Sequence, residues 1–244
     1  YSGVLANNGA GTGSFVKSGD GELRLGGTST ITGTITVSAG NLQVGVSNAG
    51  SVGSGGVTVS TGATMSGTGT ILGTIATNHS MGGTLRPGDS GGASMGTFKA
   101  QGNLVFTPAA STFMQVASPS STFDKVQGLT SGGTMTLDGT VKVDFESYTP
   151  AAGDSWQIFD WSVLNMSAFN SGTNLRSGFD GVDEGDLDLP DVTLQSLLWD
   201  LSSFSSGGIL SLVSVPEPSR MVQVLLGIAV LLRRRGRDQP TRCT

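Results

Sequence analysis

The sequence predicts an all-β protein built as a parallel β-helix, a solenoid in which short strands stack coil upon coil. Three observations favour this fold. Short runs with apolar residues at every second position recur at intervals of roughly 20 residues, as stacked coils require. A glycine lies at the corner between the two strands of each run. Before Met221, no segment carries the apolar periodicity of an amphipathic helix of roughly ten residues or more.

The clearest repeat unit is 35–44, and 57–65 is its counterpart; looser copies occur at 98–106 and 135–143. Each unit is predicted to be a strand, a glycine corner and a second strand, with alternate side chains pointing inward. The polar neighbours of the inward residues are expected to face solvent. The predicted inward set is Ile35, Val37, Leu42, Val44, Val57, Val59, Leu104, Phe106, Leu137, Val141 and Val143.

The corner glycines Gly40 and Gly62 are expected to adopt a positive φ, which a residue with a Cβ rarely tolerates. An antiparallel β-sandwich is the alternative fold. It requires tight hairpins, and the only Asn-Gly pair is Asn8-Gly9. Both folds remain open at this point, with the solenoid favoured.

Charge is distributed unevenly along the chain. The formal net charge is −5, yet residues 220–244 hold six arginines and one aspartate, so the preceding body carries −10. Only seven lysines and arginines are spread through that body without forming a patch, which argues against nucleic-acid binding. The single cysteine, Cys243, excludes an internal disulfide.

Two motifs that suggest catalysis or nucleotide binding are weak. Gly88-Asp89-Ser90-Gly91-Gly92 spells the nucleophile loop of chymotrypsin-like proteases, but the only histidine, His79, is too close in sequence to serve Ser90 as a base. We expect a turn there, and we expect His79 to be a loop residue without a metal partner. The glycine pair Gly67-x-Gly69 lies in a Gly/Thr-rich strand region and is no dinucleotide fingerprint. No cofactor is expected.

An acidic cluster offers a weak candidate calcium site. Six carboxylates fall within residues 180–191, and glycines among them permit tight turns. The spacing does not fit an EF-hand loop, because Val182 occupies a ligand position. A solvated acidic loop is the simpler interpretation. The cluster comprises Asp180, Asp183, Glu184, Asp186, Asp188 and Asp191.

The three tryptophans lie in short apolar stretches. Trp156 and Trp161 belong to an alternating strand-like segment, and Trp199 follows two leucines. We expect core or cap positions rather than a sugar-binding cleft. Carboxylates are also sparse before residue 120, which weighs against a paired-carboxylate glycosidase.

Residues 13–45 resemble the autotransporter-associated β-strand repeat. They contain the corner Lys17-Ser18-Gly19-Asp20-Gly21, then the Leu-x-Leu strand 23–25, and they close on 40–44, Gly-Asn-Leu-Gln-Val. Segments 67–70, 83–90 and 124–126 resemble downstream parts of such passenger domains. The resemblance implies an exported β-solenoid.

The end of the chain resembles the PEP-CTERM sorting signal of exported bacterial proteins. It combines the motif Val215-Pro216-Glu217-Pro218-Ser219, the apolar run 221–232 and the cluster Arg233-Arg234-Arg235. The prolines keep the motif extended, and the arginines favour the cytoplasmic face of a membrane. The resemblance implies cleavage by an exosortase-type transpeptidase after an inner-membrane intermediate.

The predicted organisation is a solenoid over 1–112, its continuation and C-terminal cap over 113–214, the sorting signal with a short hydrophobic helix over 215–237, and a tail over 238–244. The chain opens at Tyr1, without the initiator methionine and signal peptide of an exported precursor, so we expect a fragment or a mature form. The favoured function is a non-enzymatic structural or adhesive protein of the cell envelope or extracellular space, with extracellular polysaccharide as a partner. The alternative is a secreted polysaccharide-acting enzyme on the same scaffold.

Overall fold

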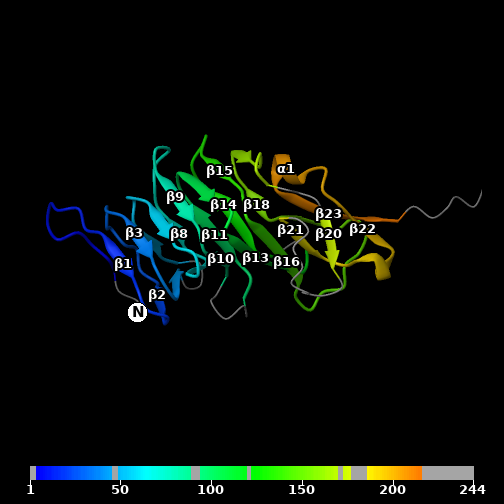
Figure 1. Cartoon of the computed structure of the whole chain (residues 1–244), viewed down its shortest axis with the longest axis horizontal. Helices are drawn as coiled ribbons and strands as arrows, with labels where there is room; N and C mark the ends of the chain where they lie inside the picture. The colour runs from blue at the N-terminus through cyan, green and yellow to red at the C-terminus, as the bar shows by residue number, and fades with distance from the viewer. Residues whose placement is uncertain are drawn as a thin grey trace, which may run out of the picture. The chain divides into compact units, whose positions relative to one another are not determined.

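The computed structural model of the chain describes residues 4–45, 49–88, 94–119, 122–169, 173–176 and 186–215. The chain divides into two compact units, Tyr1–Val213 and Ser214–Thr244. The first unit carries the stack of strands, and the coils follow one another from β1 and β2 at one end to β22 and β23 at the other (Figure 1).

Three sheets of parallel strands form the faces of the stack. Sheet A pairs its seven strands in the order β1 (Phe15–Lys17), β3 (Ile35–Val37), β6 (Val57–Val59), β9 (Asn78–Met81), β12 (Asn103–Phe106), β15 (Thr134–Thr136) and β19 (Val163–Asn165). Because each strand pairs with its counterpart one coil further along the chain, the sheets run along the stack.

Sheet B follows the same plan over most of its length. It pairs eight strands in the order β2 (Glu22–Leu25), β4 (Asn41–Val44), β7 (Thr64–Gly67), β10 (Thr84–Pro87), β13 (Ser111–Val116), β16 (Thr140–Phe145), β21 (Leu187–Pro190) and β20 (Thr173–Arg176). At its last step the sheet departs from chain order, since β21 lies between β16 and β20.

Sheet C and a small fourth sheet complete the described strands. Sheet C pairs β18 (Phe159–Asp160), β14 (Lys125–Gly128), β11 (Thr97–Ala100), β8 (Thr70–Ile71) and β5 (Ser51–Val52). The fourth, which we call the cap sheet, pairs β17 (Ser155–Gln157), β23 (Ile209–Ser214) and β22 (Leu197–Asp200). In the cap sheet β17 runs antiparallel to β23. The only helical turns in the described part of the chain are η1 (Thr193–Gln195) and α1 (Phe204–Gly207).

These parallel registers confirm the β-solenoid and exclude the antiparallel sandwich. Ile35 lies opposite Val57 and Leu42 opposite Met65, so the predicted units 35–44 and 57–65 occupy successive coils in register. A full coil supplies the long connection that parallel neighbours need.

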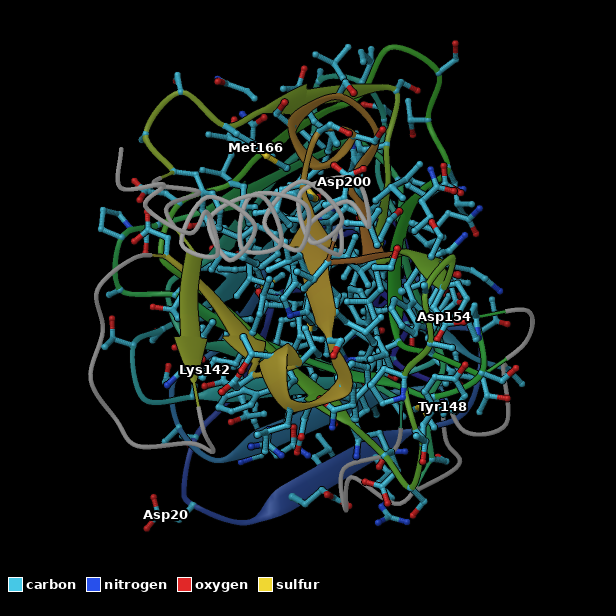
Figure 2. The ribbon with its side chains drawn as sticks, turned by 90° about the vertical axis from the view of Figure 1, so that its right-hand side faces the viewer. Asp20, Lys142, Tyr148, Asp154, Met166 and Asp200 are labelled. Atoms are coloured by element: carbon cyan, nitrogen blue, oxygen red, sulfur yellow. The ribbon has the colours of Figure 1, made fainter. Side chains whose placement is uncertain are left out.

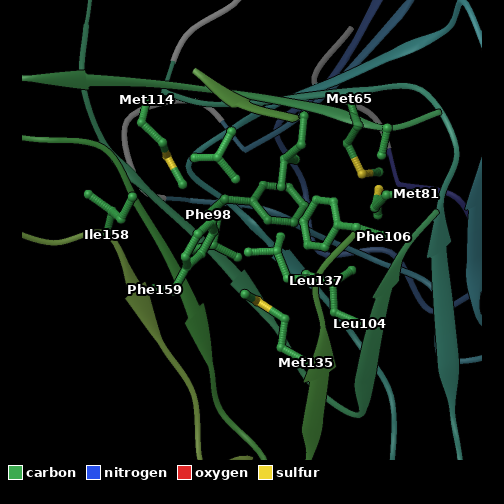
Figure 3. Packing of buried hydrophobic residues seen from close by; sticks show 14 of the residues in the cluster. Met65, Met81, Phe98, Leu104, Phe106, Met114, Met135, Leu137, Ile158 and Phe159 are labelled. Carbon is green, nitrogen blue, oxygen red and sulfur yellow. The ribbon is translucent and has the colours of Figure 1, made fainter. Parts of the chain in front are cut away.

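The predicted interior is also confirmed. All eleven residues of the predicted inward set are at most 2% exposed. Figure 3 shows Phe98 and Phe106 at the centre of the packed side chains, with Met65 and Met81 on one side and Phe159 on the other. Burial of an aliphatic side chain contributes about 1.5–3 kcal/mol, so the alternating rows account for much of the stability.

One predicted repeat was placed on the wrong corner. In 98–106 the strands are β11 and β12, which belong to sheets C and A, whereas 35–44 turns from sheet A to sheet B. The counterpart of 35–44 in that coil is therefore β12 with β13. Left-handed glycines occur at both kinds of corner, Gly40 at φ 66° and Gly102 at φ 94°, so the glycine pattern does not distinguish them.

The prediction that polar neighbours face solvent is wrong at Gln43. This side chain lies in β4 and is fully buried, as is Ser66 next to it in β7. Thr58 and Ser38 are exposed as expected. Alternation identifies the outer side of a strand, but it does not show whether other chain segments cover that side.

Candidate functional site

The outer faces of the sheets differ in charge. Outward side chains of the sheet A strands are Ser, Thr, Asn and Val, with Val16 and Val163 60% and 47% exposed. Charged side chains project from the other two faces, among them Arg86 and Lys142 on sheet B and Lys99 and Lys125 on sheet C. Interactions that depend on charge therefore belong to sheets B and C.

His79 is the clearest difference from the sequence-based expectation. It lies within β9, not in a loop, and its side chain is fully buried. Its Nδ1 accepts a hydrogen bond from the Val57 backbone N–H at 3.1 Å, and its Nε2 lies 2.7 Å from the Gln101 carbonyl oxygen. A carbonyl only accepts, so Nε2 carries the proton and the ring is neutral. Burial lowers the pKa of His79, although the bond to Gln101 acts in the opposite direction.

This arrangement leaves His79 no nitrogen with which to act as a base. Nδ1 accepts a hydrogen bond from the Val57 backbone N–H, and Nε2 donates one to the Gln101 carbonyl on a neighbouring coil. A triad histidine needs a free acceptor nitrogen aimed at the serine. The turn predicted at 89–92, including Ser90, lies outside the described residues.

Asp124 is a buried carboxylate that joins two coils. Its Oδ1 accepts from the Gly96 N–H at 2.8 Å, and its Oδ2 accepts from the Gln115 N–H at 2.9 Å. The residue is 1% exposed. Burial raises its pKa to about 7, and the two backbone hydrogen bonds only partly offset this effect.

Lys17, the lysine of the corner motif, is hydrogen-bonded to backbone carbonyls of two coils. Its amine donates to the carbonyl oxygens of Gly19 at 2.6 Å and Ala39 at 3.0 Å, with Ser18 at 3.5 Å. The residue is 7% exposed, so these carbonyls replace water around the ammonium group. The lysine thereby ties the corner of the first coil to that of the second. The corner motif does not reveal this role in the sequence, because lysines are mostly exposed to solvent.

Most carboxylates on the described loops accept hydrogen bonds from nearby backbone. Asp191 and Asp200 accept from the N–H groups of Thr193 and Ser202, and these bonds lower the pKa of both. Asp154 accepts hydrogen bonds from the Ala151 N–H and the Tyr148 hydroxyl, and Figure 2 labels Asp154 and Tyr148 on the same side of the view. Such carboxylates hold turns together.

The acidic cluster is only partly described. Asp180, Asp183 and Glu184 lie outside the described residues, so the calcium site remains a prediction. Asp188 lies in β21 and is 3% exposed, so the expectation of a solvated loop is wrong at this position. Within the residues that the structure describes, no three His, Cys, Asp or Glu side chains lie close enough to hold a metal ion.

The tryptophans occupy core and cap positions, as predicted. Trp156 is fully buried in β17, where its Nε1 donates to the Ala117 carbonyl. Trp199 in β22 stacks on Phe145, with ring centroids 5.8 Å apart and planes inclined by 10°. Trp161 packs against the core and is half-buried. The ring centroids of Trp156 and Trp199 lie 6.0 Å apart, so these two side chains belong to one aromatic cluster of the cap sheet.

The segment that resembles a sorting signal lies outside the described residues except for Val215, which is exposed. Over the ranges that the structure does describe, no helix is long and apolar enough to cross a lipid bilayer.

A family model matches the N-terminal part of the chain. The model of the passenger-associated transport repeat matches residues 15–44, which span β1 to β4. The match covers the region expected from the corner motif, and the repeat family indicates an exported or cell-surface protein. A search of curated proteins found none that matches the chain.

Proposed function

We propose that the chain is an exported, non-enzymatic surface protein whose β-solenoid serves as a structural or adhesive element of the cell envelope or extracellular matrix. The observation that carries this proposal is the repeat match on β1 to β4, followed by in-register coils through to β19. A surface of stacked coils presents the same kinds of side chain at regular intervals, which suits contact with an extended partner.

Several side chains that could act in catalysis are hydrogen-bonded to the backbone, which supports a non-enzymatic role. His79 has both nitrogens bonded to backbone, and Asp124, Asp154, Asp191 and Asp200 accept backbone N–H groups. A polysaccharide-cleaving site needs two carboxylates free to face the substrate within about 10 Å of each other. Release of reducing ends from a panel of polysaccharides by the purified chain would favour the enzyme alternative instead.

We further propose that the end of the chain is a PEP-CTERM-like sorting signal. Pro216-Glu217-Pro218 would be the extended recognition element, 221–232 the membrane segment, and Arg233-Arg234-Arg235 the stop on the cytoplasmic side. Twelve residues make roughly 18 Å of helix against a hydrocarbon core of about 30 Å. So short a span holds weakly, which suits an intermediate awaiting an exosortase-type transpeptidase better than a permanent anchor.

The sorting proposal is tested in the native host. Replacing Pro216, Glu217 and Pro218 by alanine should leave export intact but trap an uncleaved precursor in the inner membrane. Deleting 215–244 should instead release the solenoid to the periplasm or medium. If the alanine variant still lost its tail and reached the wild-type location, the segment would be a plain C-terminal anchor or no signal at all.

A further inference from the structure

Three neighbouring strands of sheet B carry an ordered group of side chains on their outer face. In one row Thr84, Ser111 and Thr140 lie side by side on β10, β13 and β16. Two residues further along the same strands, a second row holds Arg86, Phe113 and Lys142. All six are half-exposed. We call this group the sheet B grid.

The two cations of the grid are held by an aromatic ring rather than by carboxylates. The guanidinium carbon of Arg86 lies 4.3 Å from the centroid of the Phe113 ring, and the Lys142 nitrogen lies 5.8 Å from it. The ion pairs between described residues involve other cations, Arg24 and Lys125. A ring quadrupole orients a cation but leaves its charge uncompensated. Among the described residues neither Arg86 nor Lys142 forms an ion pair, so both can offer their charge to an anion.

The distribution of charge along the chain favours binding of an anionic ligand to the N-terminal side of the grid. Residues 1–119 contain only three acidic residues, Asp20, Glu22 and Asp89, against four lysines and arginines. The other acidic residues of the body follow residue 119. Asp188, which occupies the register position beside Lys142, and Asp144 mark the acidic boundary of the grid.

We propose that the sheet B grid binds an acidic polysaccharide, one that carries carboxylate or sulfate groups. Arg86 and Lys142 stand on strands two places apart, which corresponds to roughly 10 Å across the sheet. They can pair with acidic groups on separate sugars of one chain, while the row of Thr84, Ser111 and Thr140 offers hydroxyls to sugar hydroxyls. Phe113 holds both cations in place before the ligand arrives.

A polysaccharide fits this surface better than a nucleic acid does. Nucleic-acid affinity comes mainly from contacts to phosphate, which only the two cations of the grid can make. Uncharged hydroxyls make up half of the grid, and these match a sugar ring. The inference rests on the proposed matrix function and names the chemistry of its partner.

The test measures binding of the full chain to polygalacturonate by isothermal titration, with neutral dextran as the comparison ligand. Wild type should bind the polyuronate and not dextran, and affinity should fall as salt rises from about 0.05 to about 0.3 M. The double variant Arg86→Gln/Lys142→Gln should lose roughly tenfold or more in affinity. The matched double variant Lys99→Gln/Lys125→Gln removes the same charge from sheet C and should bind within roughly twofold of wild type.

A third variant distinguishes the positioning of the two cations by Phe113 from the effect of their charge. Phe113→Leu keeps both cations but removes the ring between them, so it should weaken binding less than the double variant does. Equal loss in both double variants would show a diffuse charge effect and overturn the grid. Absence of polyuronate binding by wild type, or tighter binding of single-stranded DNA, would overturn the acidic polysaccharide while leaving the sorting test unaffected.

Discussion

The imidazole Nδ1 of His79 accepts the backbone N–H of Val57 across two adjacent strands of sheet A. A side chain thus takes the place of a backbone acceptor inside the stack, and Nε2 extends the link to the Gln101 carbonyl. The only histidine of the chain is a hydrogen-bonded member of the core.

Replacing His79 by leucine should destabilise the solenoid by about 2 kcal/mol or more, because two buried backbone groups lose their partner. Chemical denaturation at pH 7.5 measures this cost. His79→Gln keeps one donor and one acceptor and should recover part of it. A leucine variant as stable as wild type would contradict the assigned hydrogen bonds.

The lowered pKa of His79 predicts acid sensitivity. Protonation of Nδ1 breaks the bond from Val57, so the contribution of this residue is present above the unfolded pKa of 6.5 and is lost as pH falls through the lower folded pKa. Denaturation midpoints measured from pH 8 downward should show a loss in wild type that is absent from His79→Leu. Identical pH profiles for the two proteins would rule this out.

Asp124 should give the opposite pH dependence. Burial raises its pKa from 3.8 to about 7, so the folded state favours the protonated acid and its contribution is lost as pH rises through about 7. In the His79→Leu background, stability should therefore increase between about pH 7 and about pH 4. Adding Asp124→Asn should flatten that rise. Persistence of the rise would assign it to another group.

A matched pair of glycines separates backbone strain from steric clash. Gly19 and Gly40 have φ values of 77° and 66°, but a Cβ at Gly19 meets nothing within 4 Å, whereas one at Gly40 would lie 2.5 Å from the carbonyl oxygens of Gly19 and Gly21. Gly19→Ala should cost about 1 kcal/mol through φ alone. Gly40→Ala should cost clearly more, as thermal unfolding would show; equal costs would mean that the coils relax freely at this corner.

Removing the corner lysine tests the role of the repeat motif. Lys17→Met deletes the donor shared by the carbonyls of Gly19 and Ala39 and should cost about 1–3 kcal/mol. Lys99→Met changes a half-exposed lysine on sheet C and should shift stability by less than about 0.5 kcal/mol. Protection of the Gly40 and Asn41 amides from hydrogen exchange should fall in the first variant only. Equal effects of the two changes would deny Lys17 a special role.

The sequence predicted the fold and the interior because both follow from local alternation. Val37 and Val141 are both buried. Alternation within each strand predicts this burial without information on which other strands lie next to it. The corner of 98–106 was misplaced because Gly40 and Gly102 look alike in sequence while they join different sheets. His79, Gln43 and Asp124 were misjudged or overlooked for a different reason. Their neighbours include residues on other coils, more than 20 residues away for Val57, Gln101, Ser66 and Gly96, and no short pattern encodes such contacts.

In sheet B the order of the last two strands differs from their order in the chain, because β21 lies between β16 and β20. From β2 to β16, each strand pairs with the sheet B strand before it in the chain, so the order of the coils in space is their order in sequence. Strand β20 cannot join in this way, because its only described neighbour is β21, which follows it in sequence. Pairing at the β16 edge therefore requires Leu187–Pro190, which follows β20 in sequence. A chain cut before residue 187 would lack β21 and would leave the edge of β16 unpaired by this strand, and an unpaired edge is a template for pairing with another chain.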